Sequence, residues 1–357
     1  MSGIVRRLAA RLGGMDRIDA LVDLEGTDLK SLLLHVFAER ARRLAPRDVL
    51  AAFEREPAFT VSPVDPRRSR EVIGAHLDAA AAFEAVELSP ICPQGTATAL
   101  SGIHQNNVLA ASRGAEVLSD LTLPMALESA RRRRAGRREP IRLCATHRLM
   151  RFQPAPPGLL PHFRLFAATS AVRGPVDDEL RAHVAIYLDA FRALAGRGYR
   201  LADLTVDLSD TRAVARRLQH AGIPLEEVRR KVRTTVGASA DLGLPPLRGT
   251  VDEVLAAAPA LGDAAAAVER LARTAVEPLA AAYPEARVRV DLGRLEGLGY
   301  YAGPCLRING TAPDGRTYPL ADGGATRWME TLLGDRRERL LISGIGADLI
   351  NLRFTGP

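Results

Sequence analysis

Two strand-like runs place the tightest limit on how this chain can fold. They lie at residues 141–152 (IRLCATHRLMRF) and 162–172 (HFRLFAATSAV), on either side of the proline-rich segment QPAPPGLLP. Runs of this length that mix apolar and polar residues are typical of strands, and the prolines end the first run. The pattern predicts a hairpin with a long connection. Further strand-like runs follow in YRLADLTVDL, ARVRVDLGRL and YYAGPCLRING, so we expect an α/β fold (α+β) built on a sheet of several strands.

Composition shifts divide the rest of the chain. Apolar residues recur at helical spacing before residue 60, and the segment TVSPVDPRRSR that follows breaks helices and marks a connector. Beyond it, FEAVELSP alternates like a half-buried strand, and residues 176–285 are rich in Ala and Leu. We therefore predict a helical N-terminal extension at 1–60, a first core part at 61–175, a mostly helical insertion at 176–285 and a second core part at 286–357.

The C-terminal segments are less regular. DGGATRWMETLLG predicts a helix, and SGIGADLINL predicts a glycine-rich turn that enters a helix. No apolar run reaches 18 residues, and the N-terminus lacks the pattern of a secretory signal, so we expect a cytoplasmic protein that does not enter a membrane. The three cysteines lie far apart and in no CxxC spacing, which predicts neither disulfides nor a metal site.

Basic residues raise the question of nucleic acid, since the formal net charge is +7. The one dense run comprises Arg131 to Arg134 with Arg137 and Arg138, after a helix-like segment. Such a run is either a solvated helix end or a polyanion site, and charge alone does not decide between them.

Four segments, taken in order, resemble the catalytic core of histidyl-type class II aminoacyl-tRNA synthetases and the synthetase-like regulatory subunit of ATP phosphoribosyltransferase. They are EVLSDLTLPMALESARR (116–132), the hairpin that carries Arg151, LEGLGYYAG (295–303), and DGGATRWMETLLG followed by SGIGADLI. The resemblance covers roughly residues 60 to 352. It implies an antiparallel class II sheet flanked by helices, and a homodimer with motif 1 near VELSPICP (86–93) at the interface.

The resemblance also implies roles for individual residues. Asp120 and Thr122 would hold the ammonium of an amino acid, and Arg151 of motif 2 would hold its carboxylate and the α-phosphate of ATP. Further members of the implied site are Tyr300, Tyr301 and Glu296 on the substrate side, and Gln153, Gly344 and Gly346 on the nucleotide side.

Several positions depart from the family pattern. The Arg-x-Glu of motif 2 reads Arg151-Phe152-Gln153, and the expected arginine of motif 3 is Leu349. Adenylation needs preorganised cations at the α-phosphate, and each is commonly worth several kcal/mol in the transition state. We also expect no anticodon-binding domain after the core, which argues against tRNA charging.

The histidine-reading residues of the family are replaced as well. Its glutamine and glutamate on the second hairpin strand correspond to Ala168 and Val172 here, and its Arg, Asp and Thr around the Tyr pair correspond to Glu296, Gly299 and Ala302. Apolar walls cannot select a polar side chain through hydrogen bonds. We therefore expect a ligand other than histidine, one that is smaller or more apolar but still resembles an amino acid.

Each of these residues also has a purely structural interpretation. Asp120 can cap the helix that follows it, and Arg151 can be a surface residue. A strand would send Tyr300 and Tyr301 to opposite faces, so only one of them could line a pocket. The glycines at 344 and 346 can serve turns as readily as a close approach to a ligand.

Two functions of different class follow. The first is a non-charging paralogue that binds a small amino-acid-like ligand and acts as a regulatory or accessory subunit of a partner enzyme. The second is a tRNA-independent ligase that uses ATP and Mg²⁺ to activate an amino-acid carboxylate, with Arg151 as its catalytic residue. The loss of the motif 3 arginine favours the first, whereas the retained Asp120, Thr122 and Arg151 favour the second.

Overall fold

The computed structural model describes residues 3–152, 160–228, 247–257 and 261–355. The chain divides into two compact units, which are described separately. The larger unit contains residues 62–90, 120–149 and 162–357, and the smaller contains residues 1–61, 91–119 and 150–161.

A nine-stranded sheet organises the larger unit. Its strands, in spatial order, are β1 (Glu84–Ala85), β5 (Ile141–Met150), β6 (His162–Arg173), β12 (Glu338–Gly346), β11 (Thr317–Thr326), β10 (Pro304–Thr311), β7 (Ala202–Asp210), β9 (Arg287–Asp291) and β8 (Arg248–Gly249). From β6 to β7 the neighbours are antiparallel, whereas β1 runs parallel to β5 and β7 parallel to β9. The centre of the sheet is thus the antiparallel arrangement expected from the sequence.

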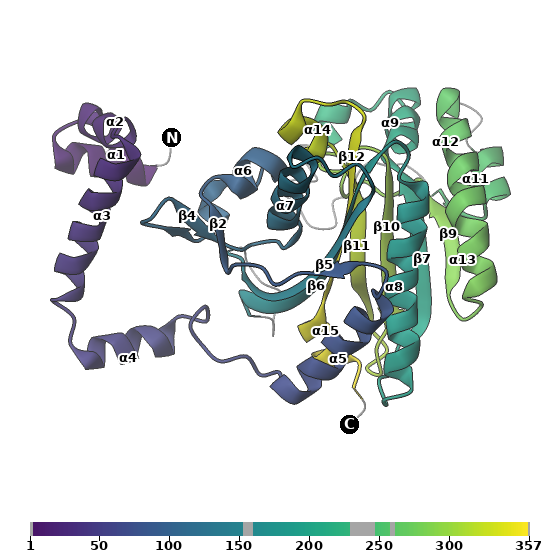
Figure 1. Cartoon of the computed structure of the whole chain (residues 1–357), viewed down its shortest axis with the longest axis horizontal. Coiled ribbons are helices and arrows are strands. Elements are labelled where there is room, and N and C mark those ends of the chain that lie inside the picture. The colour runs from purple at the N-terminus through teal and green to yellow at the C-terminus, as the bar shows by residue number, and fades with distance from the viewer. Residues whose placement is uncertain (1–2, 153–159, 229–246, 258–260, 356–357) are drawn as a thin grey trace. The chain divides into compact units, whose positions relative to one another are not determined.

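Helices bury one face of this sheet, and Figure 1 shows α5 and α8 lying along it. The helices of this layer are α5 (Pro66–Ala79), α8 (Asp177–Ala195), α9 (Thr211–His220), α12 (Asp263–Leu271), η4 (Ala272–Val276), α13 (Glu277–Ala282) and α15 (Ala347–Arg353), with α11 (Val251–Ala257) beside α12. Alternate strand residues such as Val206, Leu208 and Ile308 point into this layer and form the main core together with Tyr187 and Phe191.

The opposite face of the sheet carries a smaller helical layer. α7 (Thr122–Arg134) and α14 (Trp328–Leu333) pack on each other and on β12, and α7 also packs on β6. Arg132 and Arg133 of the basic run are paired with Glu84 and Glu338 of the same unit. The remainder of this face, over β11, β10, β7 and β9, carries polar side chains.

A buried polar cluster fixes α8 on the sheet. The imidazole of His183 lies 2.8 Å from Ser343 Oγ through Nδ1 and 3.0 Å from Ser170 Oγ through Nε2. Tyr187 donates its hydroxyl to Ser343 Oγ at 2.7 Å. Burial lowers the pKa of His183 to about 3, so the ring is neutral at physiological pH. All four side chains of the cluster, including Ser170, are buried.

The smaller unit combines helices with a short sheet. Its elements are α1 (Gly3–Leu12), α2 (Met15–Val22), α3 (Gly26–Ala41), α4 (Pro46–Arg55), β2 (Ile91–Pro93), α6 (Thr96–Ser101), η1 (Gln105–Asn107), β3 (Ala110–Ala111) and β4 (Ala115–Val117). The buried carboxylate of Glu116 accepts the backbone N–H groups of Gly95 and Ala97, both at 2.8 Å, which ties β4 to the start of α6. Large apolar side chains that stay exposed, including Leu50 and Phe53, are concentrated in this unit.

The predicted hairpin is confirmed as β5 and β6, and helices occupy most of residues 3–55. Two predictions near the C-terminus are wrong. Residues 317–326, including the first part of DGGATRWMETLLG, form strand β11, and the helix starts only at Trp328; SGIG is the end of β12 rather than a turn. Of FEAVELSP, only Glu84–Ala85 is a strand. The predicted domain boundaries stay a prediction, although β7, inside the range 176–285, is a strand of the main sheet.

Candidate functional site

The polar face of the sheet is built by alternation. In β7, β9 and β10 every second residue enters the core, so the residues between them project to the other side. Register then aligns them across strands, because Asp207 of β7 lies opposite both Arg289 of β9 and Arg307 of β10, and Arg307 lies opposite Asp322 of β11. Opposite charges are therefore cross-strand neighbours, an arrangement that stabilises a sheet.

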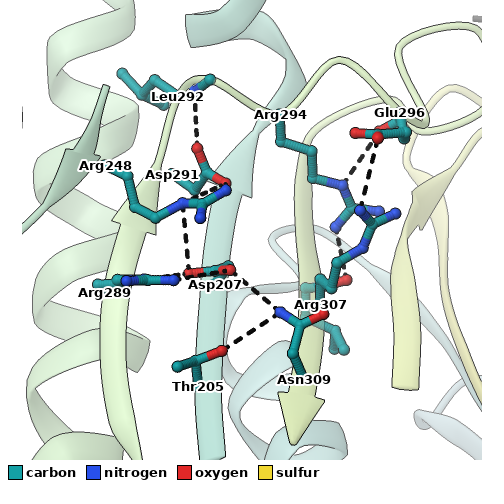
Figure 2. Close-up of polar contacts among 12 residues, drawn as sticks. Thr205, Asp207, Arg248, Arg289, Asp291, Leu292, Arg294, Glu296, Arg307 and Asn309 are labelled. Carbon is teal, nitrogen blue, oxygen red and sulfur yellow. Dashed lines mark hydrogen bonds and ion pairs between the residues drawn. The ribbon is translucent and has the colours of Figure 1, made fainter. Parts of the chain in front are cut away.

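Asp207 is the centre of the first group of contacts (Figure 2). The Asp207 side chain is 3% exposed. Its carboxylate accepts hydrogen bonds from Arg289 Nε at 2.5 Å and from Asn309 Nδ2 at 3.4 Å. Arg248 of β8 lies 3.9 Å from the same carboxylate and donates to Asp291 Oδ2 at 2.6 Å. These contacts join strands β8, β9, β7 and β10 on their polar face.

Asp322 is the centre of the second group. It accepts two hydrogen bonds from Arg294 Nη2, at 2.7 and 3.0 Å, and one from the Tyr301 hydroxyl at 2.6 Å. Arg307 reaches Asp322 at 3.3 Å and Glu296 at 3.7 Å, and the Arg307 and Glu296 side chains are drawn together in Figure 2. The side chain of Arg294 is only 3% exposed, so this guanidinium depends on the carboxylate beside it.

The electrostatics of this cluster follow from those contacts. Burial and the neighbouring Asp322 carboxylate raise the pKa of Tyr301, so its hydroxyl stays protonated and donates. Burial by itself would lower the pKa of Arg294, yet Asp322 holds it above its ordinary value. Four guanidinium groups, of Arg248, Arg289, Arg294 and Arg307, meet four carboxylates, of Asp207, Asp291, Asp322 and Glu296. The face is polar but balanced in charge.

Of the residues proposed from the sequence, Tyr301 and Glu296 belong to this cluster. Tyr300 packs edge-on against Trp328, with ring centroids 5.4 Å apart. Both tyrosines lie in a turn before β10 and not in a strand, so the expected alternation of faces does not apply, although their side chains do have different surroundings. Tyr301 lies over Gly324, where an added Cβ would approach its ring to 2.7 Å.

Asp120 and Thr122 are in contact at the start of α7. One carboxylate oxygen of Asp120 accepts the backbone N–H of Thr122 at 2.9 Å and its hydroxyl at 2.7 Å. Thr122 is buried, whereas Asp120 is partly exposed. This contact fixes the direction of the carboxylate just before α7. The N-cap residue of the helix is Leu121, so Asp120 is not the N-cap that the structural interpretation expected.

Arg151 belongs to the smaller unit. Its Nε donates to the carbonyl of Ser119 at 2.7 Å, and its backbone N–H donates to Pro161 O at 2.8 Å, which holds the base of the hairpin connection. Gln153 lies outside the described residues.

Gly344 and Gly346 lie in the last part of β12. Gly344 is opposite Asp322 on one side and Ala167 on the other, so it is on the polar face. An added Cβ at Gly344 would make ordinary contact, 3.4 Å from Leu165, and one at Gly346 would lie 3.8 Å from Leu349. A side chain at either position would therefore cause no steric clash with the surrounding backbone.

The sequence assignment of Ala168 and Val172 to the ligand side is wrong. Ala168 pairs with Ser343, whose side chain meets α8, so Ala168 and Val172 face the helix layer and join the main core. The alternate residues Ala167 and Ala171 take the polar face. A shift of one residue in a strand reverses every side chain. The conclusion drawn from these positions is unchanged, because alanines stand at the corrected positions too.

Leu349, at the motif 3 position, lies in apolar surroundings. Leu349 is a residue of α15 and packs against the main core. Its neighbour Asp348 is buried and pairs with Arg148 of β5 at 3.2 Å. Arg148 is therefore already paired within the protein.

Arg248, Arg289, Arg294, Arg307, Asp207, Asp291 and Asp322 were not identified from the sequence. Charged residues alternating with Val, Leu and Ile in 205–209, 287–291 and 306–309 were the available signal, but such alternation usually marks a solvated face. Within the described ranges, no group of three or more His, Cys, Asp or Glu side chains could hold a metal ion. Each carboxylate of the cluster is paired with at least one arginine.

Solved structures with this fold are histidyl-type synthetases and a related regulatory subunit. One is the ATP phosphoribosyltransferase regulatory subunit/histidyl-tRNA synthetase from Bacillus halodurans C, with a TM-score of 0.64, 18% identity and 84% of each chain covered. A histidine–tRNA ligase subunit from Alicyclobacillus acidocaldarius gives 0.61 and 20% identity over 83% of this chain and 96% of that one. Histidyl-tRNA synthetase from a Nostoc species gives 0.60 and 16%, over 82% and 73%.

A scan against protein-family models gives no match, and a search of curated protein sequences gives none either. At these identities the structural likeness establishes the fold. The chain therefore shares the core fold of histidyl-type class II synthetases, as the four sequence segments indicate, with a mixed α/β architecture around one large sheet. Within the described part of the chain, no helix has the length and apolar character to span a membrane.

Proposed function

We propose that this chain is a paralogue of the histidyl-type synthetase that does not charge tRNA, binds a small amino-acid-like ligand and acts as an accessory subunit of a partner enzyme. The observation that carries the proposal is the charge-balanced cluster on the polar face, in which four arginines meet four carboxylates. A ligand with one positive and one negative group can exchange with such pairs without leaving a net charge behind. A triphosphate would need a surplus of cations.

The motif 3 position supports the same function. Leu349 packs against the core where the family pattern has an arginine, and Arg148 beside it is committed to Asp348. The transition state of adenylation would therefore lack a cationic contact commonly worth several kcal/mol. Binding without activation is the simplest use of such a site.

The proposed ligand contacts use both the cluster and α7. The Asp120 carboxylate, already fixed by Thr122, would accept the ligand ammonium. Tyr301 and Glu296, which lie in the Asp322 cluster, would contact the ligand side chain. The alanines at 167 and 171 leave that side chain without strong polar partners, which favours a small or apolar one.

The alternative function is a tRNA-independent ligase that activates an amino-acid carboxylate with ATP and Mg²⁺. It rests on the retained Asp120, Thr122 and Arg151, groups that a scaffold alone would not need. Under both alternatives we propose a homodimer, which sedimentation analysis can test directly.

A binding screen separates the two functions. The purified chain is titrated with each amino acid, with ATP·Mg²⁺ and with both, by thermal shift and calorimetry, because a specific ligand stabilises the folded state by mass action. We expect one or a few small amino acids to bind alone, with no response to ATP. Stabilisation by ATP that one amino acid enhances would contradict the accessory function and favour the ligase.

Variants then locate the site. Asp120→Asn should weaken binding of the identified amino acid at least about tenfold, since it removes one charge-assisted contact. Asp314→Asn is the matched control, because Asp314 is an exposed carboxylate in the β10–β11 turn that also accepts a backbone N–H two residues on. Equal affinities of the two variants would reject the Asp120 assignment. If ATP does bind, Arg151→Ala should abolish that binding without unfolding the chain, and unchanged affinity would reject the motif 2 assignment.

A further inference from the structure

Arginines gather around a hollow at one end of the sheet in the larger unit, outside the cluster described above. Two adjoining cavities of about 480 and 450 Å³ lie there, which is the size range of small-molecule sites. The C-terminal ends of β6 and β11, the start of β12, the residues before β10 and the first turns of α8 and α9 supply their walls; α9 and α14 are both labelled at this end in Figure 1. We call this the arginine groove. Its arginines are Arg173, Arg212, Arg270, Arg327, Arg336, Arg337 and Arg339.

Ion pairs hold several of these arginines in fixed positions. Arg337 donates to both oxygens of Asp335, at 3.1 and 2.9 Å, and Arg173 reaches the same carboxylate at 2.5 Å. Arg212 similarly binds the buried Asp210 at 2.9 and 2.5 Å. A guanidinium that is already oriented loses less freedom when it binds a ligand.

The groove keeps a surplus of positive charge. Its seven arginines face five carboxylates, those of Asp177, Asp210, Glu330, Asp335 and Glu338. One of these, Glu338, is shared with Arg133 of α7. The guanidinium groups of Arg327 and Arg336, both exposed, make no hydrogen bond or ion pair with any described residue. This differs from the polar face, where the charges cancel.

The floor of the groove is apolar. Val176, Pro304 and Ala325 are buried residues that line the larger cavity, with Pro175 at its edge. Arginine recognises phosphate through paired N–H donors, whereas an apolar floor favours an organic group. The groove thus combines cationic walls with an apolar floor, an arrangement that suits a ligand with an anionic group and an apolar group.

From this geometry we infer that the arginine groove binds a small phosphate ester, with its phosphate between Arg336, Arg339 and Arg327 and its organic part on the floor formed by Val176, Pro304 and Ala325. None of the lining residues belongs to the charge-balanced cluster around Asp207 and Asp322, so the inference does not rest on the proposed function. The groove gives an accessory subunit a second ligand through which to respond.

The test uses the full-length chain and three probes in calorimetry: inorganic phosphate, inorganic pyrophosphate and phenyl phosphate. We expect saturable binding that weakens with added salt. Phenyl phosphate should bind several-fold more tightly than inorganic phosphate, because the ring covers the apolar floor. Equal affinities would overturn the assignment to an ester, and the absence of saturable binding by all three probes would overturn the site.

Variants test the location. The double variant Arg327→Gln and Arg336→Gln removes two guanidinium groups that have no partner among the described residues. It leaves no carboxylate without its arginine, so the fold should be unaffected. Pyrophosphate affinity should fall at least about tenfold, as expected for lost charge-assisted contacts. Arg316→Gln is the matched control, since Arg316 is an exposed arginine before the opposite end of β11. An equal loss in this control would show diffuse charge attraction and refute the groove. Binding of the amino acid should be unchanged in the double variant, which keeps this test independent of the proposed function.

Discussion

Arg289→Met isolates the strongest electrostatic claim made for the polar face. The substitution removes the guanidinium and replaces it with an uncharged side chain of broadly similar shape. The Asp207 side chain, which is 3% exposed, then keeps only Asn309 at 3.4 Å and Arg248 at 3.9 Å among these partners. Breaking a buried ion pair from one side costs about 3–5 kcal/mol, because a charge stays buried without its partner. Since Arg289 is itself 21% exposed and Arg248 remains nearby, we expect the lower end, about 3 kcal/mol.

The assay is urea unfolding followed by tryptophan fluorescence. Trp328 is the only tryptophan of the chain and is buried in the larger unit, so its signal reports the unit that contains the change. Arg337→Met is the matched control: Arg337 is 73% exposed and its partner Asp335 keeps Arg173, so its loss should cost less than about 1 kcal/mol.

A second substitution completes the cycle. Asp207→Asn should recover part of the stability lost in Arg289→Met, because no buried charge then lacks a partner; the coupling energy should be about 1–3 kcal/mol. An Arg289→Met variant no less stable than Arg337→Met, or a double variant without recovery, would refute the reasoning about this pair.

Three further predictions concern other parts of the larger unit. The free energy of unfolding should decrease by about 2 kcal/mol from pH 6.5 to pH 5 through His183 alone. The folded pKa of His183, about 3, lies below its unfolded value, so only the unfolded ring takes up a proton in this range. A His183→Gln variant with an equally steep decrease would contradict this. Gly323→Ala should destabilise the protein by more than about 3 kcal/mol in urea unfolding, because its Cβ would lie 2.5 Å from a backbone carbonyl oxygen of β12. Gly344→Ala, whose Cβ would have contacts of 3.4 Å, should cost under about 1 kcal/mol. Similar costs for the two variants would reject the argument from crowding. Tyr301→Phe should cost about 1–2 kcal/mol by removing the 2.6 Å hydrogen bond to Asp322, and an unchanged urea midpoint would show that this bond contributes nothing.

The elements with the most regular patterns could be predicted from the sequence. The hairpin 141–152 and 162–172 is found as β5 and β6, because each of its strands is long, largely apolar and bounded by prolines or glycine. The four ordered segments indicated the fold that the structural comparisons show. Local signals of this kind suffice where neighbouring residues agree with one another.

Other elements depend on packing that a sequence does not display. Residues 317–326 contain Asp322-Gly323-Gly324, which disfavours a strand in isolation, yet the glycines are needed because Tyr301 and the backbone of β12 approach them closely. The same close approach puts Tyr301 beside Asp322.

The candidate site shows the same limit. Asp207 and Arg289 are 82 residues apart, and their pairing depends on strand register. Arg294 and Asp322 are 28 residues apart, and their pairing depends on the path of the loop between β9 and β10. The ligand-facing residues of β6 were placed one position too far along, at Ala168 and Val172, because the sequence pattern of that strand is apolar on both faces.

The most direct test of the central claim is the amino-acid-dependent exchange of labelled pyrophosphate into ATP, measured for the full chain with Mg²⁺ and each amino acid that binds in calorimetry. The reaction requires reversible adenylation, so the account predicts no exchange above the level without amino acid. Exchange that depends on one amino acid, and that is lost in the Arg151→Ala variant, would contradict the account and identify the protein as a ligase.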